Sequence, residues 1–233
     1  MADGLAVPAR ALAISAHPDD AELQAGATLA RWAREGCEVS ILVCTDGSKG
    51  SWDAAQDRTE LAAVRREEQR AALQALGGSG SCAFLDQVDG ELESGLPQRA
   101  LVAAAIRRLR PEVVLGHDPW RRYRLHPDHR HAGRLACEGI VAARDPLFFP
   151  EQGLAPWRPS ALLLWEADEV DHEEPVDEQA LDAKAAALQA HRSQYVTTLG
   201  IDRPDDAASL AAHRRRVGLD TGPAEGFHLL VDL

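Results

Sequence analysis

The stretch ALAISAHPDDAELQAGATLARWAREG, residues 11–36, joins a short apolar run to a helix-length segment through a His-Pro-Asp-Asp turn. The apolar run, residues 11–16, is nearly continuous rather than alternating, which is typical of a strand covered on both faces. Residues 21–35 place leucine, alanine and arginine at helical spacing and end before Gly36, a residue type that commonly follows a helix. This arrangement predicts the first strand and the first helix of a β-α-β unit.

The same alternation of apolar runs and amphipathic segments continues along the chain. The predicted strands are residues 11–16, 38–45, 82–85, 112–116, 161–166 and 227–231. The predicted helices are residues 21–35, 59–76, 98–109, 128–143, 177–192 and 205–216. Strands and helices that alternate in this way form right-handed crossovers and a mostly parallel sheet. We therefore expect a Rossmann-like α/β fold with helices on both faces of the sheet, as one domain over residues 1–233.

Composition excludes several classes of protein. The 233 residues are 45% apolar and 27% charged, close to globular averages, so wholesale disorder is ruled out. The net charge of −12 argues against a general nucleic-acid binder, because neutralisation of phosphates favours basic proteins. Uninterrupted apolar runs reach about seven residues, far below the ~20 that span a bilayer. Asp3 and Arg10 interrupt the region where a signal peptide needs an apolar run, so we expect a cytoplasmic protein with no membrane partner.

Four cysteines each lie in or beside an apolar stretch: Cys37, Cys44, Cys82 and Cys137. None forms a C-x-x-C pair, so neither a cysteine zinc site nor a redox motif is indicated. We expect buried free thiols, in keeping with a reducing compartment.

Ligands of parallel α/β sheets bind beyond the carboxyl ends of the strands, which directs attention to the segments after the predicted strands. These segments are residues 16–21, 46–57, 86–97, 117–129 and 167–175. The chain has no G-x-G-x-x-G after the first strand and no G-x-x-x-x-G-K-[ST], so the usual nucleotide-binding signatures are missing. It has no G-x-S-x-G either, which removes the simplest serine-hydrolase interpretation.

Two of these segments contain a His-Pro-Asp element: His17-Pro18-Asp19-Asp20 after the first strand and His126-Pro127-Asp128-His129 after the fourth. The composition predicts roughly 0.5 His-Pro pairs by chance. Proline and an acid are ordinary at a helix start, so either element alone is explained as a cap. A cap does not explain the histidine, since Ser, Thr, Asn and Asp cap better. Imidazole nitrogens and carboxylates suit Zn²⁺, so the pair predicts a metal site with spare carboxylates for acid-base chemistry.

The two elements resemble the paired signature of the PIG-L/LmbE family of zinc-dependent N-acetylglucosamine deacetylases. Further stretches extend the resemblance over about residues 11–194: Thr45-Asp46-Gly47, then Arg65 and Glu68 followed by Ala72 and Leu76-Gly77, then Lys184 with His191-Arg192-Ser193-Gln194. The resemblance implies an LmbE-like fold and a hydrolase that removes an N-acetyl group from an N-acetylglucosamine-type amino sugar or its conjugate. It implies one Zn²⁺ per chain, with Fe²⁺ also accepted because a two-histidine, one-carboxylate set is not selective. Family members are often oligomers, so the resemblance leaves a homo-oligomer open.

The resemblance also implies the roles of individual residues. The metal ligands would be His17, Asp20 and His129. Asp19 would be the general base that takes a proton from the attacking water. His126 would stabilise the oxyanion or protonate the leaving amine, and Asp128 would orient His126.

Other polar residues near the expected site have two interpretations each. Arg65 would contact the substrate according to the resemblance, although the charged run at residues 65–68 alone predicts a solvated helix face. Asp46 would hydrogen-bond sugar hydroxyls or simply belong to a glycine-rich turn, and Asp118 would line the pocket or simply be a turn residue. The acid-rich run at residues 168–178 predicts a solvated loop.

Two alternatives to an amino-sugar deacetylase stay open at this point. The same scaffold could hydrolyse a non-sugar amide. The chain could instead be a non-catalytic ligand-binding module in which both His-Pro-Asp elements are helix caps and no metal binds.

Overall fold

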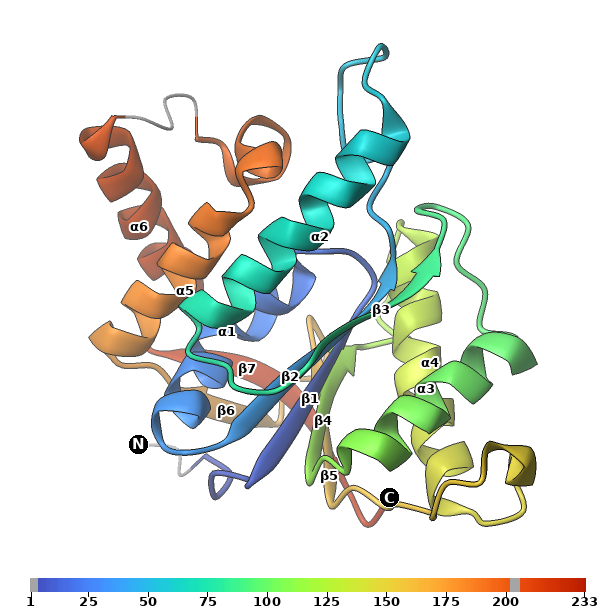
Figure 1. The fold of residues 1–233 in the computed structure, drawn as a ribbon. Coiled ribbons are helices and arrows are strands. Elements are labelled where there is room, and N and C mark those ends of the chain that lie inside the picture. The colour runs from blue at the N-terminus through green and yellow to red at the C-terminus, as the bar shows by residue number, and fades with distance from the viewer. Residues whose placement is uncertain (1–3, 202–205) are drawn as a thin grey trace.

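A seven-stranded sheet runs through the middle of the molecule, and the computed structural model describes residues 4–201 and 206–233 (Figure 1). The strands are β1 (Arg10–Ser15), β2 (Glu38–Thr45), β3 (Cys82–Gln87), β4 (Val113–His117), β5 (Ala161–Trp165), β6 (His172–Pro175) and β7 (Ala224–Val231). Their order is β3-β2-β1-β4-β5-β7-β6. The first five strands are parallel, and β7 is antiparallel to both β5 and β6. The predicted mostly parallel sheet is therefore confirmed.

Helices cover both faces of the sheet, as predicted. They are α1 (Asp20–Arg34), α2 (Arg58–Ala75), α3 (Leu96–Leu109), α4 (Pro127–Arg144), α5 (Glu178–Ala190) and α6 (Ala207–Thr221), with short turns η1 (Pro150–Gln152), η2 (Arg192–Gln194) and η3 (Tyr195–Leu199). In Figure 1, α1, α2 and α5 lie on one side of the sheet and α3 and α4 on the other, while α6 packs outside α5. The predicted start of the last helix, residue 205, lies outside the described residues.

One strand, β6, was not expected, because its sequence lies in the acid-rich run at residues 168–178. Glu174 in this strand is fully buried: its carboxylate accepts a hydrogen bond from the Leu5 backbone N–H at 2.8 Å and pairs with Arg31 on α1. A buried carboxylate with these partners is stable at a sheet edge. The predicted solvated loop is therefore wrong for these four residues.

Alternate residues of β1 point into two separate hydrophobic cores. Ala11 and Ala13 belong to the core under α1, α2 and α5, whereas Leu12 and Ile14 belong to the core under α3 and α4. This two-sided burial explains why the strand sequences are continuously apolar. Among the described residues, no helix combines the length and the apolar composition that crossing a bilayer requires.

A buried carboxylate connects β7 to the middle of α1. Glu225 accepts hydrogen bonds from the backbone N–H groups of Ala27 and Thr28, at 3.1 and 2.7 Å, and from Lys184 Nζ at 2.7 Å. These contacts tie α1, α5 and β7 together at the middle of α1.

The strand order reverses between β1 and β4, because the chain runs outward from β1 to β3 and then returns to the other side of β1. Ligands of such sheets bind in the crevice beyond the carboxyl ends of the strands at this point. Both His-Pro-Asp elements lie there, since one follows β1 and the other precedes α4.

Candidate metal centre

The structure brings the three predicted metal ligands together. His17 Nδ1 lies 3.5 Å from Asp20 Oδ2, and His129 Nε2 lies 3.4 Å from Asp20 Oδ1. The two ring nitrogens, His17 Nδ1 and His129 Nε2, are 3.2 Å apart. His17 and Asp20 are held by the turn from β1 into α1, and His129 by the first turn of α4. Neighbouring strands β1 and β4 bring these two turns together.

These separations fit a small divalent cation. Zinc bonds of about 2.0–2.2 Å in a tetrahedron place neighbouring ligand atoms about 3.3 Å apart. The donors are two imidazole nitrogens and a carboxylate, which is a set that zinc enzymes use with one further position left open. The same region contains several groups of histidine and aspartate side chains that could hold a metal ion.

His17 is oriented for this role by two more carboxylates. Its Nε2 lies 3.2 Å from Asp128 Oδ2 and 3.3 Å from Asp89 Oδ1, so Nδ1 is left to face Asp20 and His129. Burial lowers the pKa of His17, but the hydrogen bonds to Asp128, Asp20 and Asp89 outweigh it and raise the pKa well above its usual value. A carboxylate on the second ring nitrogen is the usual support of a metal-binding histidine.

Asp128 thus contacts a different histidine from the one expected. Its carboxylate faces His17 and accepts hydrogen bonds from the backbone N–H groups of Gly90 and Leu92, at 2.6 and 3.2 Å. His126 meets Asp128 through the backbone instead, where His126 Nδ1 accepts the Asp128 N–H at 3.3 Å and caps α4. The cap interpretation of this histidine is therefore also valid, alongside its position at the site.

The pKa of His129 lies below its usual value, which favours the neutral imidazole that binds a metal. Burial lowers its pKa to about 4, although Asp20 opposes this effect. Arg124 Nη1 lies 2.9 Å from His129 Nδ1 and 2.6 Å from Glu166 Oε2. Because a guanidinium only donates, a metal on Nε2, which leaves the ring proton on Nδ1, requires the contact with Arg124 to open.

Asp19 lies beside the three ligands, and its contacts differ from theirs. It is buried and has left-handed backbone angles, with φ 95°. Arg65 holds this conformation: it donates to Pro18 O at 2.6 Å and contacts Asp19 Oδ2 at 3.2 Å, while Gln69 Oε1 accepts the Asp19 N–H at 3.0 Å. Burial raises the pKa of Asp19 to about 6, although the charge of Arg65 opposes this effect. Its carboxylate makes no cap hydrogen bond to α1, so the cap interpretation does not account for Asp19.

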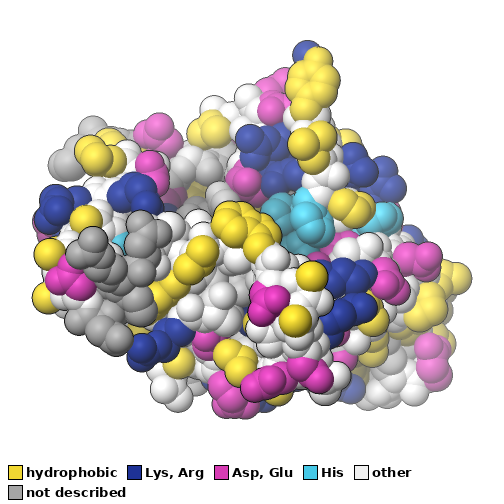
Figure 2. All heavy atoms as spheres, turned by 90° about the horizontal axis from the view of Figure 1, so that it is seen from above, with side chains coloured by type: hydrophobic (Ala, Val, Ile, Leu, Met, Phe, Trp, Pro, Cys, Tyr) yellow, Lys and Arg dark blue, Asp and Glu magenta, His cyan; other side chains and the backbone are white. Residues whose placement is uncertain are grey.

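These groups surround a hollow of about 400 Å³. Figure 2 looks down on the carboxyl ends of the strands and shows histidines near the middle of that face, bordered by basic and apolar side chains. The hollow is lined mainly by polar side chains, which include His17, Asp19, Asp20, Lys49, Arg65, Asp89, His126, His129, Gln194 and Thr198. It therefore suits a ligand with many hydrogen-bonding groups.

Of the three predicted substrate contacts, one lines the hollow and two do not. Arg65 lines the hollow and is buried, so the expectation of a solvated helix face is wrong for this residue. Asp46 and Asp118 do not line it. Asp46 Oδ1 accepts the backbone N–H groups of Ser48 and Asp89, at 2.9 and 3.1 Å, and Asp118 Oδ1 accepts the Trp120 N–H at 2.8 Å. Asp118 lines a neighbouring hollow of about 300 Å³.

Sequence reasoning missed two residues at the site. Asp89 follows β3 and contacts His17. His117 ends β4, is fully buried, and places Nε2 3.2 Å from Asp20 Oδ2. The available signal was position alone, since both residues lie at the carboxyl end of a strand.

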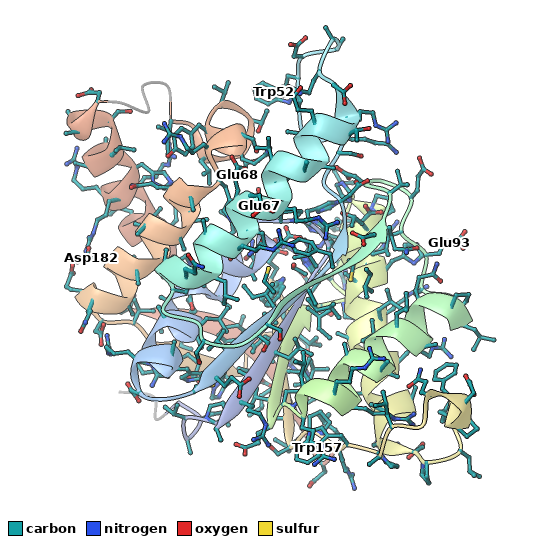
Figure 3. The ribbon with its side chains drawn as sticks, in the orientation of Figure 1. Trp52, Glu67, Glu68, Glu93, Trp157 and Asp182 are labelled. Carbon is teal, nitrogen blue, oxygen red and sulfur yellow. The ribbon has the colours of Figure 1, made fainter. Side chains whose placement is uncertain are left out.

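The residues after α5 support the site from the α2 side. Figure 3 shows Glu68 on α2, where its carboxylate accepts the Ser193 N–H and hydroxyl at 2.7 and 2.6 Å. Gln194 donates to Gly50 O at 3.1 Å and lines the hollow. His191 is fully buried, with Nε2 3.6 Å from Glu22 Oε2. Residues 191–194 thus connect α2, the loop at Gly50 and α1 beside the hollow.

Comparison with known proteins identifies the family of the chain. Residues 12–140 match the family described as PIG-L: GlcNAc-PI de-N-acetylase. The chain is 34% identical over 189 residues to diacetylchitobiose deacetylase of Thermococcus kodakarensis, covering 80% of this chain and 70% of the relative. It is 34% identical to 1D-myo-inositol 2-acetamido-2-deoxy-alpha-D-glucopyranoside deacetylase of Geodermatophilus obscurus over 62% of this chain and 57% of that relative.

A solved structure shares the whole architecture. N,N'-diacetylchitobiose deacetylase from Pyrococcus horikoshii superposes with a TM-score of 0.80 at 29% identity, over 96% of this chain and 84% of that one. The fold is thus LmbE-like, as the resemblance implied, and all three relatives are deacetylases by name. From the match over residues 12–140 and these relatives, we conclude that the chain belongs to the PIG-L family.

Proposed function

We propose that the protein is a metal-dependent hydrolase that removes the acetyl group from the nitrogen of an N-acetylglucosamine-type amino sugar or its conjugate. The observation that carries this proposal is the convergence of His17, Asp20 and His129 to separations of 3.2–3.5 Å, in a polar hollow that also contains Asp19. Hydrolysis of an amide needs a polarised carbonyl, an activated water and a proton for the leaving amine. The chain has a group for each requirement.

We assign Zn²⁺ as the metal, held by His17 Nδ1, Asp20 and His129 Nε2. The donor set and the ligand separations fit zinc, and Fe²⁺ also suits two imidazoles and a carboxylate. When bound, such a metal supplies Lewis-acid polarisation of the carbonyl and favours a hydroxide nucleophile at neutral pH.

Asp19 is assigned as the general base. Its carboxylate lies beside the ligands without belonging to them, and Arg65 contacts Oδ2 at 3.2 Å, so its position is fixed by an ion pair. Its task is to accept the proton of the attacking water, as a carboxylate within hydrogen-bond reach can do. His126 borders the same hollow with an exposed ring and is assigned to the oxyanion and the leaving amine.

The substrate class follows from the lining of the hollow and from the relatives. Lys49, Asp89, Gln194 and Thr198 line the hollow and offer donors and acceptors for the hydroxyls of a sugar. Trp52 projects from the loop that leads to α2 and is 77% exposed, which offers a glycoside a flat apolar surface (Figure 3). The named relatives act on acetylated glucosamine units joined to a second sugar or to inositol.

The test is an amine-release assay on the zinc-loaded protein. We expect turnover of N-acetylglucosamine glycosides and little turnover of simple acetamides that lack a sugar. Equal turnover of both classes would support the non-sugar amidohydrolase instead. No release from any acetamide, with stoichiometric zinc present, would refute the proposal.

A further inference from the structure

A buried indole is connected to the proposed ligand Asp20 through one histidine. Trp165 ends β5 and His117 ends β4, and the two are register partners that are fully buried. Trp165 Nε1 lies 2.9 Å from His117 Nδ1, and His117 Nε2 lies 3.2 Å from Asp20 Oδ2. The two contacts use opposite nitrogens of the same ring.

The indole determines which ring nitrogen carries the proton. A tryptophan N–H can only donate, so His117 Nδ1 must accept and the ring proton must lie on Nε2. The opposite tautomer would donate from Nδ1 to Glu166 Oε2 at 3.3 Å and accept the Ala16 N–H at 3.4 Å. It would also force two N–H groups against each other at the 2.9 Å contact with Trp165. The shorter contacts therefore favour the Nε2–H tautomer, which donates to Asp20.

This tautomer determines which carboxylate oxygen of Asp20 contacts His117. Asp20 Oδ2 accepts the His17 backbone N–H at 2.7 Å and faces His117 Nε2 at 3.2 Å. Asp20 Oδ1 is left on the side of His129 Nε2, at 3.4 Å. Oδ2, which also lies 3.5 Å from His17 Nδ1, is thus held by two groups of the protein, and Oδ1 faces His129.

We propose that Trp165 is a positioning residue for the metal centre: its indole N–H locks His117 as an Nε2–H donor, which holds Asp20 with Oδ1 turned to the cation. This inference rests on the proposed function, because it takes Asp20 as a ligand. It also assigns His117 as a donor to a ligand rather than as a fourth ligand. Hydrogen bonds to a ligand from such outer groups typically change metal affinity 10- to 100-fold.

The first test reads the tautomer without any metal. Long-range ¹H–¹⁵N correlation spectra of the metal-free protein report which nitrogen of each histidine ring is protonated, and His117 is assigned from the signals that disappear in His117→Gln. We expect His117 as the Nε2–H tautomer at mildly alkaline pH in the parent protein, and a mixture of tautomers in Trp165→Phe. An Nδ1–H tautomer in the parent protein would overturn the proposal.

The second test measures zinc affinity by competition with a chromophoric chelator. Trp165→Phe keeps a buried aromatic ring and removes one N–H, and we expect it to bind zinc about tenfold more weakly. Trp32→Phe is the matched control, since Trp32 is fully buried in the same core and its Nε1 has no hydrogen-bond partner among the described residues. We expect its zinc affinity to be unchanged. Equal losses in both variants would show a packing effect and overturn the proposal.

A third test compares two variants of His117 and separates hydrogen-bond donation from the shape of the ring. In His117→Gln the amide nitrogen can take the place of Nε2 and donate to Asp20, whereas His117→Leu has no donor. We expect Gln to keep most of the zinc affinity and Leu to lose it; the reverse order would contradict a donor role. Failure of the deacetylase assay with these affinities as expected would refute the proposed function and leave the positioning role intact.

Discussion

His17 Nδ1 and His129 Nε2 lie 3.2 Å apart although 112 positions separate them in the chain. Both nitrogens face Asp20, whose pKa is held well below its usual value by the neighbouring histidines despite burial. Two imidazole nitrogens and a carboxylate that converge in this way form a candidate cation-binding site.

The first prediction concerns this convergence. His129→Ala removes one ligand atom and is expected to abolish stoichiometric zinc binding, measured by elemental analysis after dialysis. His131→Ala is the control on the same helix, because His131 contacts Ser94 Oγ at 3.1 Å and does not line the hollow. Full zinc retention in His129→Ala would count against the ligand set.

The second prediction separates the base from the ligands. Asp19→Asn keeps the shape of the side chain and removes the carboxylate that contacts Arg65, while His17, Asp20 and His129 stay in place. We expect normal zinc content and a fall in kcat of about 10²–10⁴-fold, the usual contribution of a general base. The measurement is amine release at saturating substrate, and parent-like turnover would contradict the assignment of the base.

The third prediction concerns the stability of the buried ion pair. Arg65→Ala leaves the Asp19 carboxylate and the carbonyl groups of Pro18 and Gly47 without their donor, so we expect a loss of about 3–5 kcal/mol in unfolding free energy. Arg70→Ala, on the same helix, removes an exposed pair with Glu67 and should cost about 1 kcal/mol or less. Urea denaturation checks both values, and equal losses would mean that Arg65 has no special structural part.

The fourth prediction concerns pH and the four thiols. All four are free as expected, but only Cys37 and Cys44 are buried; Cys82 and Cys137 are partly exposed, so the prediction of buried thiols is wrong for those two. Burial raises the pKa of Cys37 to about 11 and of Cys82 and Cys137 to about 12, and it raises the pKa of Cys44 further. Native thiols therefore keep their protons where unfolded thiols, with a pKa near 9.0, lose theirs. This contribution to stability is complete below pH 9 and declines as the pH rises towards 11.

The corresponding measurement is alkylation by iodoacetamide. We expect slow labelling of the native protein at neutral pH and fast labelling of all four thiols in denaturant, because the thiolate is the reactive form. Rapid labelling of the native protein would show that a thiol is accessible and ionised.

Most of the fold could be predicted because each element carries its own local pattern. Residues 38–45 were predicted as a strand and form β2 with the same bounds. β6 has no such pattern: four residues rich in acid become a strand because Glu174 meets Arg31 and Leu5, which are distant in sequence. A pattern search along the chain does not detect partners that only the folded protein brings together.

The residues of the site likewise divide into those that a local sequence pattern predicts and those that it does not. The repeated His-Pro-Asp element identified the residues that converge, since two copies of an unusual turn carry information in the sequence itself. His117 belongs to no such motif and is marked only by its place at the end of β4; its contact with Trp165, 48 positions away, arises only in the folded protein. The family resemblance implied that Asp128 orients His126, whereas the N–H groups of Gly90 and Leu92 direct its carboxylate to His17.

Glu225 has a consequence for how the protein is made. Its carboxylate completes the hydrogen bonding of Ala27 and Thr28, although α1 leaves the ribosome some two hundred residues earlier, at a separation of 197–198 positions. A nascent chain therefore presents α1 long before the carboxylate that these two N–H groups contact has been made. The contacts of Glu225 with α1 and with Lys184 on α5 form only once β7 has been made and has docked.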